Sequence, residues 1–134
     1  MTGFAALAAM GLAMAGAAGA QTQQAGSFML FFDWGKPDIR QDDVATLDQV
    51  AAAWRARPGV HLQLTGHTDR SGSAAVNRAS GLKRAMKVRA ELERRGIPRN
   101  AMSVGSFGEE RPLVPTEDGV REVQNRRVDI LLEN

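Results

Sequence analysis

The sequence predicts an α/β sandwich with the element order β-α-β-α-β-β, in which two main helices pack on one face of a mixed four-stranded sheet. Two observations support this prediction. Four short segments have the apolar content of strands, and two longer segments repeat apolar residues at spacings of three and four, as amphipathic helices do. A chain of 134 residues holds one domain and a short leader, so a single hydrophobic core is expected.

The first strand is expected at residues 28–32, where FMLFF is apolar without alternation. Such a run is typical of a strand buried on both faces. Gly35 and Pro37 then form a turn. The first helix is expected to begin after Asp43, because acidic residues suit the positive end of the helix dipole, and to stop at Pro58. Its apolar face is formed by Val44, Leu47, Val50 or Ala51, and Trp54.

The second strand, residues 60–64, alternates apolar and polar side chains and leads into a turn rich in Gly and Ser. The second helix is expected over residues 73–95, with Gly96 as the residue that ends it. A third strand at 101–106 and a last strand at 125–132 are separated by a long loop that contains prolines. The apolar face of the second helix is formed by Leu82, Ala85, Val88 and Leu92.

Two charged residues frame the turn between the second strand and the second helix. Asp69 lies in the turn, and Arg84 follows fifteen residues later, a spacing at which a compact turn places both at the surface of one small pocket. A ligand with an ammonium and a carboxylate suits this pair, because Arg donates two parallel hydrogen bonds to a carboxylate. Taken alone, each residue has a simpler interpretation: Asp69 as a turn carboxylate that bonds nearby backbone N–H groups, and Arg84 as a solvated helix residue.

These two residues belong to a longer pattern. It consists of GHTD at 66–69, Gly72, Asn77, Arg84-Ala85 and NRRV at 125–128. In order and spacing the pattern resembles the OmpA-like peptidoglycan-binding domain, which is also found in peptidoglycan-associated lipoproteins and flagellar stator proteins. The resemblance covers residues 28–132. It implies the arrangement predicted above and a non-catalytic module that binds peptidoglycan through the diaminopimelate of its stem peptide.

The resemblance also implies a set of ligand-binding residues. Asp69 and Arg84 match the diaminopimelate ligands of the family, so replacing either is expected to abolish binding while lowering the melting temperature by only a few degrees. Thr68 and Asn77 match positions that line the pocket. Arg126 matches a position that contacts the ligand or braces the site. The arginine that follows it is expected to face away, because neighbouring side chains of a strand point to opposite faces.

Three positions depart from the family pattern. Gly35 stands where relatives commonly carry an acidic or amide residue before a lysine, so only its backbone N–H can contact a ligand. Ser80 and Gly81 stand where relatives usually carry Leu-Ser. A glycine inside a helix costs ~1 kcal/mol against alanine, so either the helix bends at Gly81 or another element approaches closely there. A modest affinity for a single stem peptide is expected from these departures.

Two other classes of function remain open at this stage. His67 and Asp69 form an H-x-D pair that could serve a metal-assisted hydrolase, but a zinc site needs three protein ligands and only His61 supplies another imidazole. We therefore expect no metal, no cofactor and no catalysis. The second alternative is an envelope protein-interaction module that has lost glycan binding, which the three departures would explain.

Composition and the first residues bear on location. The sequence has 17 Lys and Arg residues and 15 Asp and Glu residues, and the two kinds are interspersed. No basic stripe for nucleic acid is therefore present, and nucleic acid is not expected as a partner. Cysteine is absent, which excludes disulfides and a lipid-bearing cysteine within this sequence. Residues 1–20 are uncharged and end in an A-x-A motif, which indicates a signal peptide cleaved after Ala20, although an uncleaved membrane anchor is the alternative.

This organisation gives a signal peptide at residues 1–20, a linker at 21–27 and the binding domain at 28–134. The mature chain, starting at Gln21, is expected in the periplasm, in association with the outer membrane. Its expected partners are peptidoglycan and outer-membrane or other envelope proteins.

Overall fold

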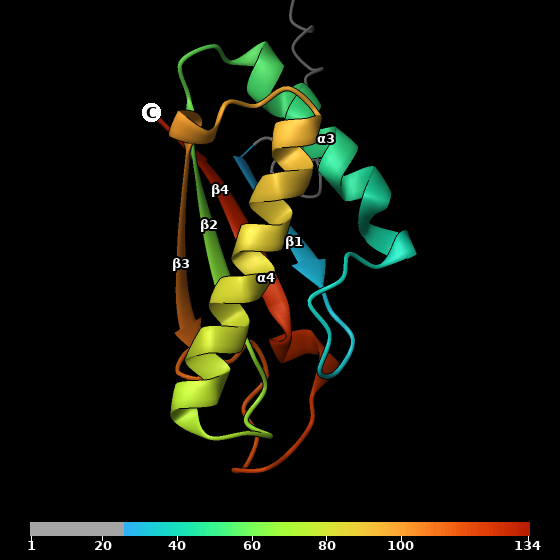
Figure 1. Ribbon diagram of the computed structural model, residues 1–134, viewed down its shortest axis with the longest axis vertical. Coiled ribbons are helices and arrows are strands. Elements are labelled where there is room, and N and C mark those ends of the chain that lie inside the picture. Colours follow the sequence, from blue (N-terminus) through green and yellow to red (C-terminus); the bar gives the residue numbers. More distant parts are fainter. Residues whose placement is uncertain (1–25) are drawn as a thin grey trace, which may run out of the picture.

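The computed structural model describes residues 26–134 (Figure 1), so the signal peptide predicted at 1–20 and most of the linker lie outside the described residues. The predicted order of the six main elements is confirmed. None of the described helices is long and apolar enough to cross a membrane. The elements are β1 (Ser27–Phe31), the 3-10 helix η1 (Gln41–Asp43), α3 (Val44–Ala56), β2 (His61–His67), α4 (Ala74–Arg94), η2 (Arg99–Ala101), β3 (Met102–Gly108), η3 (Val123–Asn125) and β4 (Arg127–Glu133).

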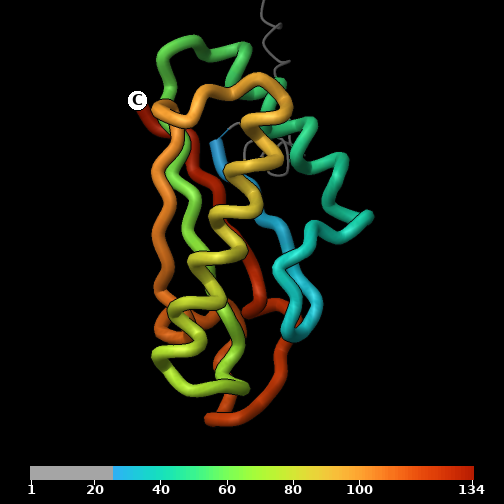
Figure 2. Tube along the Cα trace, in the orientation of Figure 1, coloured from blue at the N-terminus to red at the C-terminus, as the bar shows by residue number. Residues whose placement is uncertain are grey.

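The four strands form one mixed sheet in the order β1-β4-β2-β3. β4 lies in the middle and pairs antiparallel with both β1 and β2, whereas β2 and β3 are parallel and are joined by α4. The predicted mixed sheet with two helices is therefore confirmed. Figure 2 traces the loop after β1, the turn after β2 and the loop before β4 to the same end of the sheet. That end is where the candidate site lies.

β1 differs from its prediction as a strand buried on both faces. Phe28 and Leu30 are buried in the core, but Met29 between them is 41% exposed. The reason is that β1 is an edge strand and that the helices cover only the core face of the sheet, so alternate side chains of β1 face solvent. An uninterrupted apolar run can thus still form a strand with one open face.

The helix α4 matches its predicted bounds within one residue at each end. Ser73 caps its start, since the Ser73 hydroxyl oxygen accepts a hydrogen bond from the backbone N–H of Val76 at 3.2 Å. Gly96, with φ +99°, follows its end. The predicted apolar face is correct except for Leu82, which is 38% exposed. The position that faces the sheet there belongs to Gly81, which is buried.

Gly81 is explained by the close approach of β2. A Cβ atom added to Gly66 of β2 would lie 3.0 Å from the Cα atom of Gly81, and still closer to the carbonyl group of Gly81. A Cβ atom added to Gly81 would lie 3.1 Å from the carbonyl group of Gly66. Backbone therefore packs on backbone at this crossing. The contact holds the first half of α4, and with it Arg84, against the end of β2 that leads to Asp69.

We expect Gly66→Ala to lower the free energy of unfolding by about 3 kcal/mol, because the new methyl group meets backbone that cannot move aside. Urea denaturation followed by circular dichroism measures this change. Gly105→Ala is the matched control, since its Cβ would meet only the Gln63 side chain, at an ordinary 3.9 Å. Equal losses in the two variants would show that the crossing is not the tight contact described.

Candidate ligand-binding site

All six residues predicted for the site line one cavity of about 140 Å³. It lies between the loop after β1, the turn after β2 and the first half of α4. The predicted residues in its wall are Gly35, Thr68, Asp69, Asn77, Arg84 and Arg126. The fold therefore brings together positions that lie up to 91 residues apart in the sequence.

Asp69 is buried, with 2% of its surface exposed. Its Oδ1 accepts hydrogen bonds from the backbone N–H of Ser71 at 3.1 Å and from the Ser71 hydroxyl at 2.6 Å. Its Oδ2 accepts from the backbone N–H of Glu122 at 3.0 Å and from Nη1 of Arg126 at 2.7 Å. Burial alone would raise the pKa of Asp69, but the hydrogen bonds from Ser71, Arg126 and Glu122 outweigh it and place that pKa below the ordinary 3.8.

Asp69 lines the pocket as expected, but almost the whole residue is buried by other parts of the chain. Arg126 and the backbone of Glu122, both more than fifty residues further along the chain, close over its carboxylate. Its simpler interpretation as a turn carboxylate describes part of what it does, since it bonds the backbone of Ser71. Asp69 holds the cavity wall together and supplies a fixed negative charge to it.

Arg84 also lines the pocket as expected and is buried, with 4% of its surface exposed. Its guanidinium donates only to carbonyl oxygens: Nε to Lys36 at 3.3 Å, Nη1 to His67 at 3.4 Å and Nη2 to Asp33 at 3.3 Å. An arginine has five N–H donors, so two remain available. Phe32 lies below the guanidinium, 5.4 Å from ring centroid to Cζ.

The charge of Arg84 has no direct counterion in the part of the chain that the structure describes. Within residues 26–134, no carboxylate lies within 4.0 Å of its nitrogen atoms. Burial is the main cause that lowers the pKa of Arg84 to about 10; the nearby charge of Arg126 adds to this effect, and the charge of Asp69 partly opposes it. The side chain nevertheless stays protonated at neutral pH. A buried cation with unused N–H groups in the wall of a cavity is suited to bind an anion.

Thr68 and Asn77 hold the turn that carries Asp69. The Thr68 hydroxyl donates to the carbonyl oxygen of Asp69 at 2.8 Å. Nδ2 of Asn77 lies 3.2 Å from the same oxygen, 3.2 Å from the carbonyl oxygen of Gly72 and 2.7 Å from Oε1 of Glu109. These side chains are engaged in fixing the shape of the cavity.

Trp34 and Ser71 also line the cavity, and sequence reasoning missed both. Nε1 of Trp34 donates to the Ser71 hydroxyl oxygen at 3.0 Å, and the guanidinium of Arg121 lies over the Trp34 ring at 3.5 Å. The available signal was the position of Ser71, two residues after Asp69, where a hydroxyl commonly bonds a turn carboxylate.

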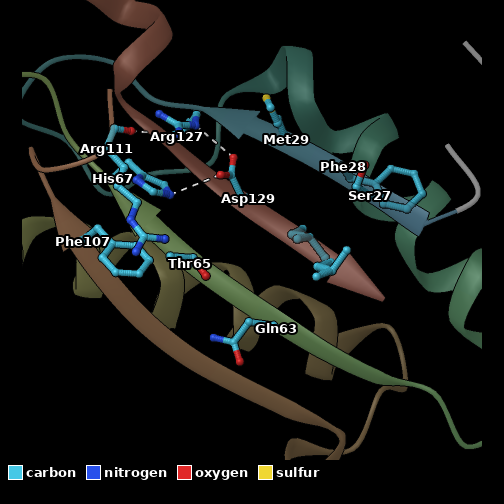
Figure 3. Close-up of a pocket in the computed structure, with 12 residues that line it drawn as sticks. Ser27, Phe28, Met29, Gln63, Thr65, His67, Phe107, Arg111, Arg127 and Asp129 are labelled. Carbon is cyan, nitrogen blue, oxygen red and sulfur yellow. Dashed lines mark hydrogen bonds and ion pairs between the residues drawn. The ribbon is translucent and has the colours of Figure 1, made fainter. Parts of the chain in front are cut away.

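The two arginines of the NRRV motif face opposite ways, as predicted. Arg126 enters the cavity wall, where Nε also donates to the carbonyl oxygen of Phe32 at 2.9 Å. Arg127 lies on the open face of the sheet, where its Nε bonds Oδ1 of Asp129 at 3.0 Å. Figure 3 shows this open face, which has its own hollow of about 630 Å³.

The H-x-D pair is separated in the same way. His67 lies on the open face, with Nε2 3.2 Å from Oδ2 of Asp129 and its ring stacked on Phe107 (Figure 3). Asp69 points into the cavity on the other side of the sheet end. The two therefore do not form an acid–base pair. In the part of the chain that the structure describes, no three His, Cys, Asp or Glu side chains form a group that could hold a metal ion.

Residues 31–126 match the sequence pattern of the OmpA family. The chain belongs to the OmpA family. This confirms the resemblance inferred from GHTD, Arg84 and NRRV. The same membership confirms the expectation of no catalysis for the matched residues 31–126, since the family consists of non-catalytic domains.

Related OmpA family sequences are cell-envelope proteins. An outer membrane protein of Gluconacetobacter diazotrophicus is 34% identical over 112 residues, which cover 79% of this chain and 30% of that protein. A peptidoglycan-associated lipoprotein of Rhizobium meliloti is 38% identical over 104 residues, which cover 77% of this chain and 58% of that protein. The chain thus spans between about a third and three fifths of the length of these curated relatives.

Solved structures confirm the OmpA-like fold. The peptidoglycan-associated lipoprotein of Burkholderia pseudomallei superimposes with a TM-score of 0.73 at 31% identity, over 78% of this chain and 89% of that one. The C-terminal domain of Helicobacter pylori MotB gives a TM-score of 0.69 over 78% of this chain and 82% of that one. Its identity is 24%, so it shows the shared fold alone.

The stability of this OmpA family domain should fall in acid. Burial would raise the pKa of Asp129, but hydrogen bonds and charge from His67 and Arg127 outweigh it, so the pKa values of Asp129 and Asp69 both lie below 3.8. A lowered carboxyl pKa stabilises the fold above the unfolded value, and that stabilisation is lost as the pH falls through the folded value. We expect the melting temperature to hold above about pH 5 and to fall below about pH 4.

Asp129→Asn provides the check on this prediction. The variant should melt at a lower temperature than the wild type at pH 7. This difference in melting temperature should shrink as the pH falls through the lowered pKa of Asp129, because the wild-type carboxyl then becomes neutral as well. Thermal melts of both proteins across this range measure the gap. A gap that is independent of pH would contradict the assignment.

Proposed function

We propose that this OmpA family domain binds peptidoglycan non-covalently through the diaminopimelate of the stem peptide. The observation that carries the proposal is the buried guanidinium of Arg84. It has unused N–H donors and no carboxylate within ion-pair distance among the described residues, and it shares a cavity with the carboxylate of Asp69. The relatives named as peptidoglycan-associated lipoproteins support peptidoglycan as the polymer that is bound.

The free end of diaminopimelate carries an ammonium and a carboxylate on one carbon atom. Arg84 would donate its two unused N–H groups to the carboxylate. Asp69 would attract the ammonium, whose N–H groups can replace the rotatable hydroxyl of Ser71 at Oδ1. Gly35 has no side chain and offers its backbone to the same cavity. No bond of the ligand changes in this arrangement, so the domain holds the peptide without altering it.

The cavity volume of about 140 Å³ suits the head group of one amino acid and not a whole peptide. Few contacts hold such a head group, so the affinity for a single stem peptide should be modest, in the micromolar range or weaker. Nanomolar binding of one stem peptide in isothermal titration calorimetry would contradict this expectation.

Co-sedimentation with purified sacculi tests the proposed function. The domain should sediment with sacculi and be released by a stem tetrapeptide that contains diaminopimelate. The matched control is the same tetrapeptide with lysine in that position, which keeps the side-chain ammonium but lacks the carboxylate on the same carbon. Release by both peptides alike would refute recognition of the zwitterion. A domain that stays in solution would favour the interaction module, and soluble glycan fragments would favour a hydrolase.

The location follows from the same proposal. The envelope relatives and the leader at residues 1–20 support a periplasmic chain that starts at Gln21, is associated with the outer membrane and contacts other envelope proteins. The domain proper would then occupy residues 28–134. N-terminal sequencing of the protein from an envelope fraction tests this, and a retained Met1 would overturn it.

A further inference from the structure

A second cavity adjoins the ligand cavity. Its volume is about 150 Å³, and three residues, Gly35, Ser80 and Arg84, line both cavities. Arg84 therefore stands in a wall common to the two. The remaining residues that line the second cavity are Lys36, Pro37 and Lys83.

The second cavity has a basic wall. Lys36, Lys83 and Arg84 carry positive charge, and no acidic residue lines it. Neither lysine has an ion-pair partner within 4.0 Å among residues 26–134. Asp33, in the loop that leads to Lys36, pairs instead with Arg40 at 3.7 Å. Three cations around one small hollow favour an anionic group inside it.

Two residues with little or no side chain help to form this cavity. Ser80 and Gly35 both lie in the wall that the two cavities share. The short side chain of Ser80 takes up little of the space, and Gly35 brings no side-chain carboxylate that would repel an anion. Both residues therefore leave room for an anion beside Arg84.

We propose that this second cavity binds a further carboxylate of the same stem peptide, that of the acidic residue joined to diaminopimelate. The inference rests on the proposed function, because the first cavity places diaminopimelate against Arg84. The peptide would then be held at two points, with the zwitterion in the first cavity and the neighbouring carboxylate between Lys36 and Lys83. Selectivity for stem peptides whose acidic residue is not amidated follows from this arrangement.

The test compares two diaminopimelate tetrapeptides by isothermal titration calorimetry, one with the acidic residue as a free carboxylate and one with it amidated. The wild type should bind the free acid about fivefold more tightly, since partly exposed ion pairs contribute little each. The double variant Lys36→Gln/Lys83→Gln should lose this preference while still binding the amide form. Arg84 donates a hydrogen bond to the backbone carbonyl of Lys36, which a side-chain substitution leaves in place.

Lys87→Gln is the matched control, because Lys87 is an exposed lysine of α4 that lines neither cavity. It should keep the wild-type preference. Equal wild-type affinities for the two peptides would overturn the second site and leave the proposed function standing. A wild type that binds neither peptide would overturn the proposed function, and this inference with it.

Discussion

Arg84→Ala should abolish co-sedimentation of the domain with sacculi and leave the fold intact. The variant removes the cation that faces the ligand carboxylate in a largely desolvated cavity, and such a loss typically costs ~2–5 kcal/mol, or about 30-fold and more in affinity. Its effect on stability should be small, because the guanidinium makes three long hydrogen bonds, of 3.3 to 3.4 Å, to carbonyl oxygens and no ion pair within the described part of the chain.

The pKa of Arg84 supports this separation of binding from stability. Burial holds the pKa at about 10, below the ordinary 12.5, so the folded state disfavours the charged form relative to the unfolded chain. The charge of Arg84 therefore opposes folding at neutral pH. Removing it should shift the melting temperature by no more than a few degrees.

Two further variants complete the Arg84 experiment. Arg84→Lys should restore binding poorly, since an ammonium keeps the charge but loses the planar two-point contact. Arg78→Ala is the matched control, because Arg78 lies on the same helix but is exposed and pairs with Glu110 at 2.9 Å. Normal binding by Arg84→Ala would show that Arg84 does not bind the ligand carboxylate. Lost binding together with a collapsed melt would make Arg84 a structural residue.

The sequence was sufficient to predict the order of the elements and six of the residues that line the cavity. Ser73 and Gly96 mark the ends of α4 through local chemistry, a cap hydroxyl and a residue free to adopt positive φ, so no tertiary information was needed. Five of the six predicted cavity residues belong to the motif, whose spacing reflects the fold, and Gly35 was found as a departure from the family pattern. The prediction from periodicity was wrong for Leu82, because the adjacent Gly81 faces the sheet and packs against Gly66 there.

The burial and the charge partners of the site residues could not be predicted in the same way. The burial of Asp69 depends on Glu122 and Arg126. That Arg84 has no counterion among residues 26–134 depends on which carbonyl groups surround it. Both are properties of loops that are distant in sequence and meet only in the folded chain. The open face of β1 is a similar case, since the sequence of β1 does not specify on how many sides the helices cover the sheet.

Asp69→Ala should differ from Arg84→Ala by losing stability as well as binding. The carboxylate is the buried counterion of Arg126 at 2.7 Å, and both of its oxygens are hydrogen-bonded. Breaking a buried pair by removing one partner leaves an uncompensated charge, so we expect the free energy of unfolding to fall by about 4 kcal/mol. This replaces the expectation of a shift of a few degrees, which assumed an exposed side chain. Urea denaturation measures the loss.

A double variant separates the two roles of Asp69, as the counterion of Arg126 and as a contact for the ligand. In the Asp69→Ala background, Arg126 has no counterion and stands close enough to Arg84 for their charges to repel. Adding Arg126→Ala removes that charge, so Asp69→Ala/Arg126→Ala should recover part of the lost stability. Sacculus binding should stay absent in the double variant, since the ligand ammonium still lacks its carboxylate. Recovery of both stability and binding would show that Asp69 only neutralises Arg126, and unchanged stability in Asp69→Ala would contradict the buried pair itself.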